Sequence, residues 1–185
     1  MAMPFPDAVG LNIPLHMMVT SLVSESGNTV TRTFVVCTVG MAMSLPNYYS
    51  YSMAVGDGSG TEYSTAYDGR ITGIRVWEHS NVYIRGIQLR YDGNWTTPVC
   101  TSNGSPLEMT LRDNETIIQV SGKYSSGYIY EFTFVTSRGR FLKVGQPSGT
   151  SFNFYPTHDR SELRFLSGRQ NGNGITSIGA HWAVY

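Results

Sequence analysis

The chain contains few residues whose types and spacing could support catalysis or metal binding. Asp57 and Glu62 could form a pair of carboxylates for glycoside hydrolysis, but only their separation in space would support that chemistry. The sequence holds no phosphate-binding loop, nucleophile elbow or dinucleotide fingerprint. The histidines lie far apart, and none has a second ligand at the spacing of a metal site: His16, His79, His158 and His181. We therefore expect no metal, no cofactor and no enzymatic activity.

The composition disfavours two further classes of function. Charged residues make up 14% of the chain, and 13 Lys and Arg balance 13 Asp and Glu. A nucleic-acid-binding surface needs an excess of positive charge to displace counterions from phosphates, so we expect no nucleic-acid partner. No apolar run approaches the roughly 18 residues that a membrane-spanning helix requires. Because charged residues are few, the surface of this protein is expected to stay soluble through neutral polar residues, which is typical of extracellular β-rich domains.

Cysteines and glycosylation motifs bear on the compartment. Cys37 and Cys100 are too few for a disulfide framework and lack the paired spacing of a zinc site, so they leave the compartment open. Three tripeptides fit the N-glycosylation pattern, and they begin at Asn94, Asn103 and Asn114. Pro106 follows the second one directly. We therefore expect glycosylation at Asn94 and Asn114, although such tripeptides also arise by chance.

The first 45 residues differ from the rest and are interpreted as an N-terminal extension. They are rich in Met and apolar residues and carry only three charged side chains. Within residues 32–44, Arg32 precedes an apolar run and then small residues, which is the order of a secretory signal. Its distance from the first residue is unusual for a signal, unless translation starts at Met17 or Met18. The alternative is a buried strand over 34–39.

Residues 46–185 are predicted to form one all-β domain. Short apolar or alternating runs recur every eight to fifteen residues with Gly, Asn, Asp or Pro between them, and none keeps helical periodicity for three turns. In residues 128–136 the alternation directs Tyr128, Tyr130, Phe132 and Phe134 inward and Glu131 outward. The segments 71–77 and 175–182 share Ile-Thr-x-Ile followed by Trp, a weak internal repeat. The predicted strands are 48–55, 71–77, 82–91, 107–111, 116–121, 128–136, 140–144, 163–167 and 175–185.

Seven motifs in residues 48–185 together resemble the animal jacalin-related lectins of the zymogen granule protein 16 type. They are Gly56-Asp-Gly-Ser-Gly60, Arg70-Ile-Thr-Gly-Ile-Arg-Val76, Ile118-Gln-Val-Ser-Gly-Lys-Tyr124, Phe134-Val-Thr-Ser-Arg-Gly-Arg-Phe-Leu142, Gly149-Thr-Ser-Phe-Asn153, Leu163-Arg-Phe-Leu-Ser-Gly-Arg169 and Ile178-Gly-Ala-His-Trp182. The resemblance covers about three-quarters of the chain. It implies a β-prism I fold, which consists of three Greek-key antiparallel sheets.

The resemblance also implies where a sugar would bind. In this family one hexose lies at one end of the prism between a glycine-rich loop, a recognition loop and a C-terminal loop with the pattern Gly-x-x-x-Asp. Carried over, the first loop is 56–60, with Gly58, Ser59 and Gly60 at the sugar; a tight structural turn is the alternative. The second is Lys123-Tyr-Ser-Ser-Gly127, with Lys123, Tyr124 and Ser125 at the sugar; Lys123 and Tyr124 follow a strand and could instead be ordinary surface residues. The third is Gly179-Ala180-His181-Trp182-Ala183, although alternation suggests that Trp182 is a core residue.

Two positions depart from the family pattern. Ala183 stands where the sugar-binding members have Asp, and a hydrogen bond to a charged group contributes roughly 1.5–3 kcal/mol. A millimolar Kd corresponds to only about 4 kcal/mol, so we expect weakened monosaccharide binding. Thr61-Glu62 replaces the basic pair of relatives that bind sulfated polysaccharides, which disfavours heparin-like ligands.

Two functions remain. The first is a secreted lectin, carried by secretory granules, that recognises mannose-type, microbial or mucosal polysaccharide glycans through multivalent contacts. The second is a granule packing or interaction protein that keeps the prism but has lost sugar binding. The sequence leaves the oligomeric state open.

Overall fold

A computed structural model describes residues 49–184 of the chain. The expected extension of residues 1–45, with its signal-like segment at 32–44, lies outside the described residues. Within residues 49–184, no helix is long and apolar enough to cross a membrane.

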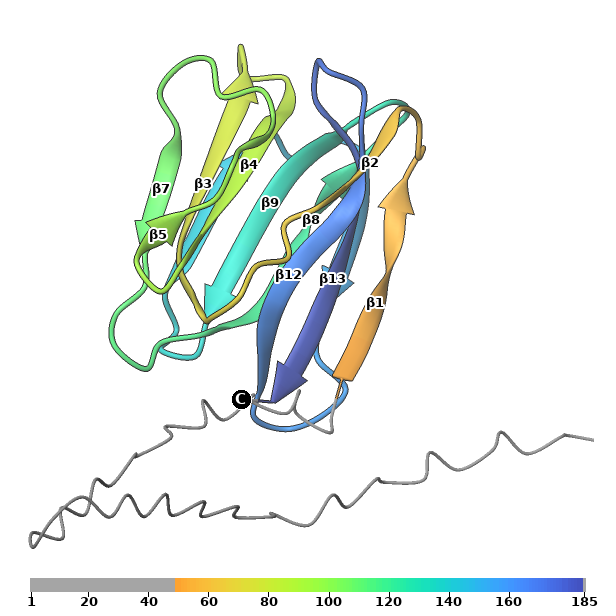
Figure 1. Ribbon diagram of the computed structural model, residues 1–185. Coiled ribbons are helices and arrows are strands. Elements are labelled where there is room, and N and C mark those ends of the chain that lie inside the picture. The colour runs from red at the N-terminus through yellow and green to blue at the C-terminus, as the bar shows by residue number, and fades with distance from the viewer. Residues whose placement is uncertain (1–48, 185) are drawn as a thin grey trace, which may run out of the picture. The chain divides into compact units, whose positions relative to one another are not determined.

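The described residues form thirteen strands in three antiparallel sheets, shown in Figure 1. The first sheet has the order β1-β13-β12-β2 and contains β1 (Tyr49–Gly56), β2 (Thr61–Ser64), β12 (Ser161–Gln170) and β13 (Ile175–Val184). The second has the order β10-β9-β8-β11 and contains β8 (Ile117–Tyr124), β9 (Ile129–Thr136), β10 (Phe141–Gly145) and β11 (Thr150–Phe154). The third has the order β5-β4-β3-β7, with β6 paired to β4; its strands are β3 (Ile71–His79), β4 (Tyr83–Tyr91), β5 (Asn94–Trp95), β6 (Val99–Cys100) and β7 (Leu107–Thr110).

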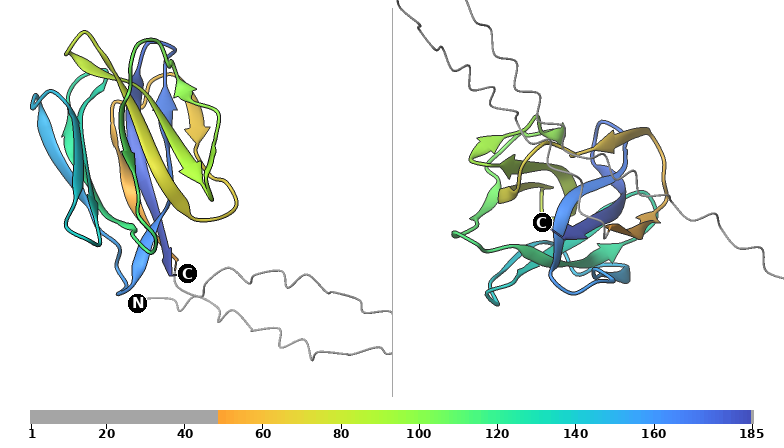
Figure 2. Two further views of the ribbon diagram at one scale, coloured as in Figure 1. Left: turned by 90° about the vertical axis from the view of Figure 1, so that its left-hand side faces the viewer. Right: turned by 60° about the horizontal axis from the view of Figure 1, so that its bottom comes forward.

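Each sheet has Greek-key order. In the second sheet, β8, β9 and β10 follow one another and β11 returns to pair with β8. The first sheet has the same order, but its strands come from both ends of the domain. There β12 and β13 form the hairpin, β1 pairs with β13, and β2 pairs with β12. The right-hand view in Figure 2, in which the bottom of the domain comes forward, shows the three sheets arranged around a common centre. The predicted all-β, β-prism I architecture is therefore confirmed.

Side chains directed between the sheets form one hydrophobic core. Phe132 and Phe134 are fully buried, as the alternation of β9 predicts, and their rings lie 5.4 Å apart. Trp182 is also fully buried, which confirms its interpretation as a core residue. Glu131 was expected to face solvent, but it is only 7% exposed and forms an ion pair with Lys143 at 3.0 Å. A charged partner thus permits burial that alternation alone does not predict.

All nine predicted strands coincide with observed strands to within a few residues. The prediction missed β2, β5, β6 and β11, which have two to five residues each. The internal repeat falls on β3 and β13, which are not equivalent: β3 is the first strand of its Greek key, whereas β13 is the second strand of its own. The residues shared by the two segments therefore do not reflect the pseudo-symmetry of the fold.

Candidate functional site

Three loops meet at one end of the prism, the upper end in Figure 1. They are residues 57–60 between β1 and β2, residues 125–128 between β8 and β9, and residues 171–174 between β12 and β13. The Thr176 hydroxyl donates a hydrogen bond to the carbonyl of Ser59 at 2.5 Å. The Asn171 side-chain amide donates to the hydroxyl of Tyr128 at 3.1 Å. These contacts join the loops into one polar surface, which we call the tip.

The glycine-rich loop is shaped by its contact with β12 and β13. Gly56 and Gly60 have φ values of 112° and 92°, which side chains rarely adopt. A Cβ at Gly60 would lie 2.2 Å from the carbonyl oxygen of Gln170, so no other residue fits without displacing backbone. The backbone N–H of Ser59 donates to Asp57 Oδ1 at 2.8 Å. The loop is therefore a tight structural turn that also leaves Ser59 and Gly60 exposed at the tip.

The β12–β13 turn is ordered by one asparagine. Asn171 Oδ1 accepts hydrogen bonds from the backbone N–H groups of Asn173 and Gly174 at 3.0 and 3.2 Å. The same side chain reaches Tyr128 through its Nδ2. Residues 171–173 are exposed, so this turn presents polar side chains at the tip. Sequence reasoning missed Asn171, although the run Asn171-Gly-Asn-Gly174 is a strong turn signal.

The loop between β8 and β9 differs in composition from the expected recognition loop. Lys123 lies within β8, and its Nζ donates to Ser151 Oγ on β11 at 2.9 Å. Tyr124 packs against the core with its ring 6.4 Å from that of Phe152. Of the three expected residues, only Ser125 belongs to the turn, where its N–H donates to the carbonyl of Tyr128.

Tyr128 is the aromatic residue that this loop brings to the tip. It was expected to point into the core, but it belongs to the turn that precedes β9 and is half-buried. Its ring stacks on Tyr83 at 4.0 Å with an interplanar angle of 7°. The signal for this position is Gly127, since a residue directly after a glycine turn lies at the end of its strand.

The expected third loop, 179–183, is not a loop. Gly179, Ala180, His181 and Ala183 lie inside β13, which is hydrogen-bonded to β1 and β12 on its two sides. Ala180 and Ala183 are 0% and 2% exposed. Ala183 is seven residues beyond Thr176, or about 23 Å along an extended strand, and therefore lies toward the opposite end of the prism. Ladder pairing on both sides explains why this segment cannot open into a loop.

The spacing Gly-x-x-x-Asp is matched elsewhere, in Gly172-Asn-Gly-Ile-Thr176. This segment begins in the β12–β13 turn and ends at Thr176, whose side chain contacts the glycine-rich loop. In this segment Thr176 stands at the fifth position, where the pattern Gly-x-x-x-Asp has Asp. Ala183, by contrast, lies inside the paired strand β13.

The match to known proteins agrees with this geometry. Residues 52–181 match the model of the jacalin-like lectin domain. Zymogen granule membrane protein 16 of Homo sapiens is 45% identical over 139 residues, which cover 74% of this chain and 81% of that protein. The protein of the same name from Rattus norvegicus is 43% identical over the same length. This chain belongs to the jacalin-like lectin domain family.

Solved structures place the jacalin-like domain among lectins of the same fold. A prostate-specific WGA16 glycoprotein lectin is 30% identical with a TM-score of 0.65, and the match covers 73% of this chain and 99% of that one. Malaysian banana lectin is 23% identical with a TM-score of 0.61, over 74% of this chain and 99% of its own. The second likeness shows the fold alone.

His181 of this jacalin-like domain lies on the outer face of the first sheet, away from the tip. Its Nδ1 is 2.7 Å from the Tyr49 hydroxyl, and its Nε2 is 2.7 Å from Ser167 Oγ. The ring of Phe165 stacks on it at 3.9 Å. Burial lowers the pKa of His181, so the imidazole is neutral near pH 7. This neutral ring organises the aromatic outer surface of the sheet.

No metal centre accompanies the tip. Among residues 49–184, no three His, Cys, Asp or Glu side chains gather where they could hold a metal ion. The tip presents hydroxyls, amides, backbone N–H groups, the Asp57 carboxylate and the ring of Tyr128.

Proposed function

We propose that this protein is a secreted lectin without enzymatic activity, and that its tip binds glycans. The observation that carries the proposal is the convergence of three polar loops at one end of a jacalin-like prism. Hydroxyls and amides around an aromatic ring can satisfy the hydroxyls of a sugar and contact its apolar face. The similarity to zymogen granule membrane protein 16 supports transport in secretory granules. The proposed ligands are mannose-type, microbial or mucosal polysaccharides.

Weak binding of single sugars is part of this proposal. A carboxylate can accept two hydrogen bonds from neighbouring sugar hydroxyls, each worth roughly 1.5–3 kcal/mol. Thr176 has no charge, and its hydroxyl is already engaged with the carbonyl of Ser59. Position 176 therefore lacks that interaction, and binding at the tip depends on several sugar units binding at once.

The second candidate is a granule packing or interaction protein that has lost sugar binding. The threonine at position 176 supports it, because the family's acidic sugar contact is missing there. A glycan array separates the two functions: silence across neutral and polymeric glycans supports the second candidate and removes the first.

Asn171→Ala is expected to lower the affinity for mannan by about tenfold, or about 1.4 kcal/mol. The substitution removes the acceptor for two backbone N–H groups of the turn and the hydrogen bond to Tyr128. Isothermal titration calorimetry with mannan measures the change.

Asn153→Ala is the matched control. Asn153 is also exposed and also hydrogen-bonded to a tyrosine hydroxyl, that of Tyr155, but it lies on β11 away from the tip. It is expected to leave mannan affinity unchanged. Equal affinities of the two variants would refute the placement of the sugar at the tip.

Asn94 and Asn114 are proposed to carry N-linked glycans. Both side chains are exposed, Asn94 in β5 and Asn114 in the loop after β7. Treatment of the secreted protein with an N-glycosidase is expected to lower its intact mass by the mass of two glycans. The variants Asn94→Gln and Asn114→Gln are each expected to lack one glycan. An intact mass that the enzyme does not change would show that neither sequon is used.

A further inference from the structure

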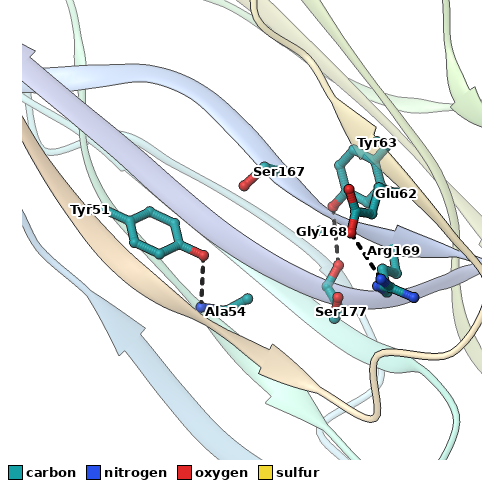
Figure 3. Close-up of a pocket in the computed structure, with 8 residues that line it drawn as sticks. All are labelled: Tyr51, Ala54, Glu62, Tyr63, Ser167, Gly168, Arg169 and Ser177. Carbon is teal, nitrogen blue, oxygen red and sulfur yellow. Dashed lines mark hydrogen bonds and ion pairs between the residues drawn. The ribbon is translucent and has the colours of Figure 1, made fainter.

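A pocket lies on the outer face of the first sheet, outside the tip. It has a volume of about 250 Å³ and is lined by residues from all four strands, among them Tyr51, Glu62, Tyr63, Ser167, Arg169 and Ser177. Figure 3 shows Tyr51 on one side of it and Glu62, Tyr63 and Arg169 on the other. We propose that this pocket, here called the side pocket, binds one neutral sugar ring of a glycan chain that also occupies the tip. The inference rests on the proposed lectin function.

Tyr51 forms an apolar wall with a fixed orientation. Its side chain is 48% exposed, and its hydroxyl accepts a hydrogen bond from the backbone N–H of Ala54 at 3.1 Å. Its ring lies 4.5 Å from that of His181. A Cβ at Gly179 would lie 2.7 Å from the Tyr51 hydroxyl, so the glycine makes room for the ring. A rigid, half-exposed aromatic ring attracts the C–H face of a pyranose, because its face carries partial negative charge.

The floor and one edge of the side pocket supply hydroxyl groups. Ser167 Oγ is positioned by its 2.7 Å hydrogen bond to His181 Nε2. The Tyr63 hydroxyl donates to the carbonyl of Ser177 at 3.2 Å and retains lone pairs as an acceptor. Groups that are held in place before binding lose little entropy when a sugar hydroxyl binds them.

The opposite wall is an ion pair with no net charge. Arg169 Nη2 lies 2.8 Å from Glu62 Oε1, and the two side chains are 42% and 80% exposed. Within the described residues this pair engages only one Glu62 oxygen, which leaves Oε2 able to accept hydrogen bonds from sugar hydroxyls. Because the charges cancel, the pocket favours a neutral sugar over a sulfated or carboxylated one.

The dimensions match one sugar unit. Pockets for drug-sized ligands have volumes of about 300–1,000 Å³. The side pocket, at about 250 Å³, is smaller than that range and suits a single ring.

The side pocket begins where the tip ends. Arg169 Nη1 donates a hydrogen bond to the carbonyl of Gly60, a tip residue, at 3.1 Å. Glu62 follows Gly60 by two positions. A glycan at the tip can therefore extend over Arg169 toward Tyr51. Two weak sites joined by one ligand can exceed either single affinity by about 10²–10⁴-fold, which compensates for the lack of a carboxylate at position 176.

The test is an NMR titration of the full chain with three probes: α-linked mannohexaose, β-linked glucohexaose and a heparin hexasaccharide. At least one neutral probe is expected to shift two groups of amide signals. One group belongs to the tip (Ser59, Tyr128 and Asn171), and the other to the side pocket (Ala54, Ser167 and Ser177). The heparin probe is expected to leave the second group in place.

Tyr51→Ala is expected to lower the affinity for the shifting neutral probe by about tenfold or more, since it removes one of two linked contacts. Tyr51→Phe, which keeps the ring, is expected to restore most of that loss and excludes a folding defect as its cause. Tyr155→Ala, at a tyrosine that is 54% exposed and lies outside both sites, is the matched control.

The outcomes separate the two proposals. The side-pocket proposal is wrong if the shifts are confined to the tip, or if the affinity of Tyr51→Ala is within twofold of the wild type. Either result is still compatible with the lectin function. Shifts with none of the three probes overturn both. Shifts of the side-pocket amides by heparin alone overturn the preference for a neutral sugar.

Discussion

Trp182→Ala is expected to lower the free energy of unfolding by about 3–5 kcal/mol, the usual cost of removing a large aromatic side chain from a core. Trp182 has no exposed surface, and its Nε1 donates a hydrogen bond to Ser52 Oγ at 2.9 Å. The substitution therefore leaves a cavity and an unpaired hydroxyl between β13 and β1. For a domain of this size, the midpoint of thermal unfolding is expected to fall by roughly 10–15 °C.

Trp95→Ala provides the comparison for that measurement. Trp95 is half-buried beneath Arg75, whose guanidinium carbon lies 3.8 Å from the ring centre. An exposed cation–π contact contributes about 0.5–1 kcal/mol, so this variant is expected to lose much less stability than Trp182→Ala. Similar losses in urea unfolding of the two variants would mean that Trp182 does not lie at the centre of the core.

Glu115→Ala is expected to lower the free energy of unfolding by about 3 kcal/mol. This value is at the lower end of the cost of breaking a buried ion pair. The Glu115 side chain is 0% exposed and receives three hydrogen bonds: from Thr136 Oγ1 at 2.6 Å, from the backbone N–H of Arg112 at 2.8 Å and from Arg140 Nη1 at 2.8 Å. Alanine leaves all three donors without this acceptor. Arg140 is 33% exposed, so water relieves part of the cost.

The Glu115 carboxylate also makes the free energy of unfolding depend on pH. Burial acts to raise the pKa of Glu115, but the hydrogen bonds from Thr136 and Arg112 and the Arg140 guanidinium outweigh it, so the pKa is lowered. The contribution of Glu115 is therefore present above its unfolded-state pKa and is lost as the pH falls through its folded-state pKa. Unfolding curves from pH 7 to pH 2 are expected to show Glu115→Gln losing less stability in acid than the wild type. Parallel curves would contradict this role.

The strands could be predicted from sequence because they are long enough to show alternation. β9 illustrates this: its period of two directs Phe132 and Phe134 inward without any knowledge of neighbouring strands. β5 and β6 have two residues each and exist only through their pairing with β4. Strands this short carry no periodic signal, and tertiary contacts alone define them.

The tip could be predicted only in part. The glycine-rich loop was found because its glycines are needed locally, where side chains would strike the backbone of β12 and β13. Tyr128 and Asn171 were missed because their importance comes from contact with each other, across 43 residues of sequence. Gly179 and Ala183 fitted a five-residue spacing, but spacing does not reveal whether a segment is a loop or a paired strand.

A crystal structure of the protein with α-linked mannohexaose would show where the sugar binds. Electron density for a sugar ring is expected at the tip, among Ser59, Tyr128 and Asn171, with hydrogen bonds to hydroxyl, amide or backbone groups there. Sugar density only on another face of the prism, with the three loops unoccupied, would contradict this expectation.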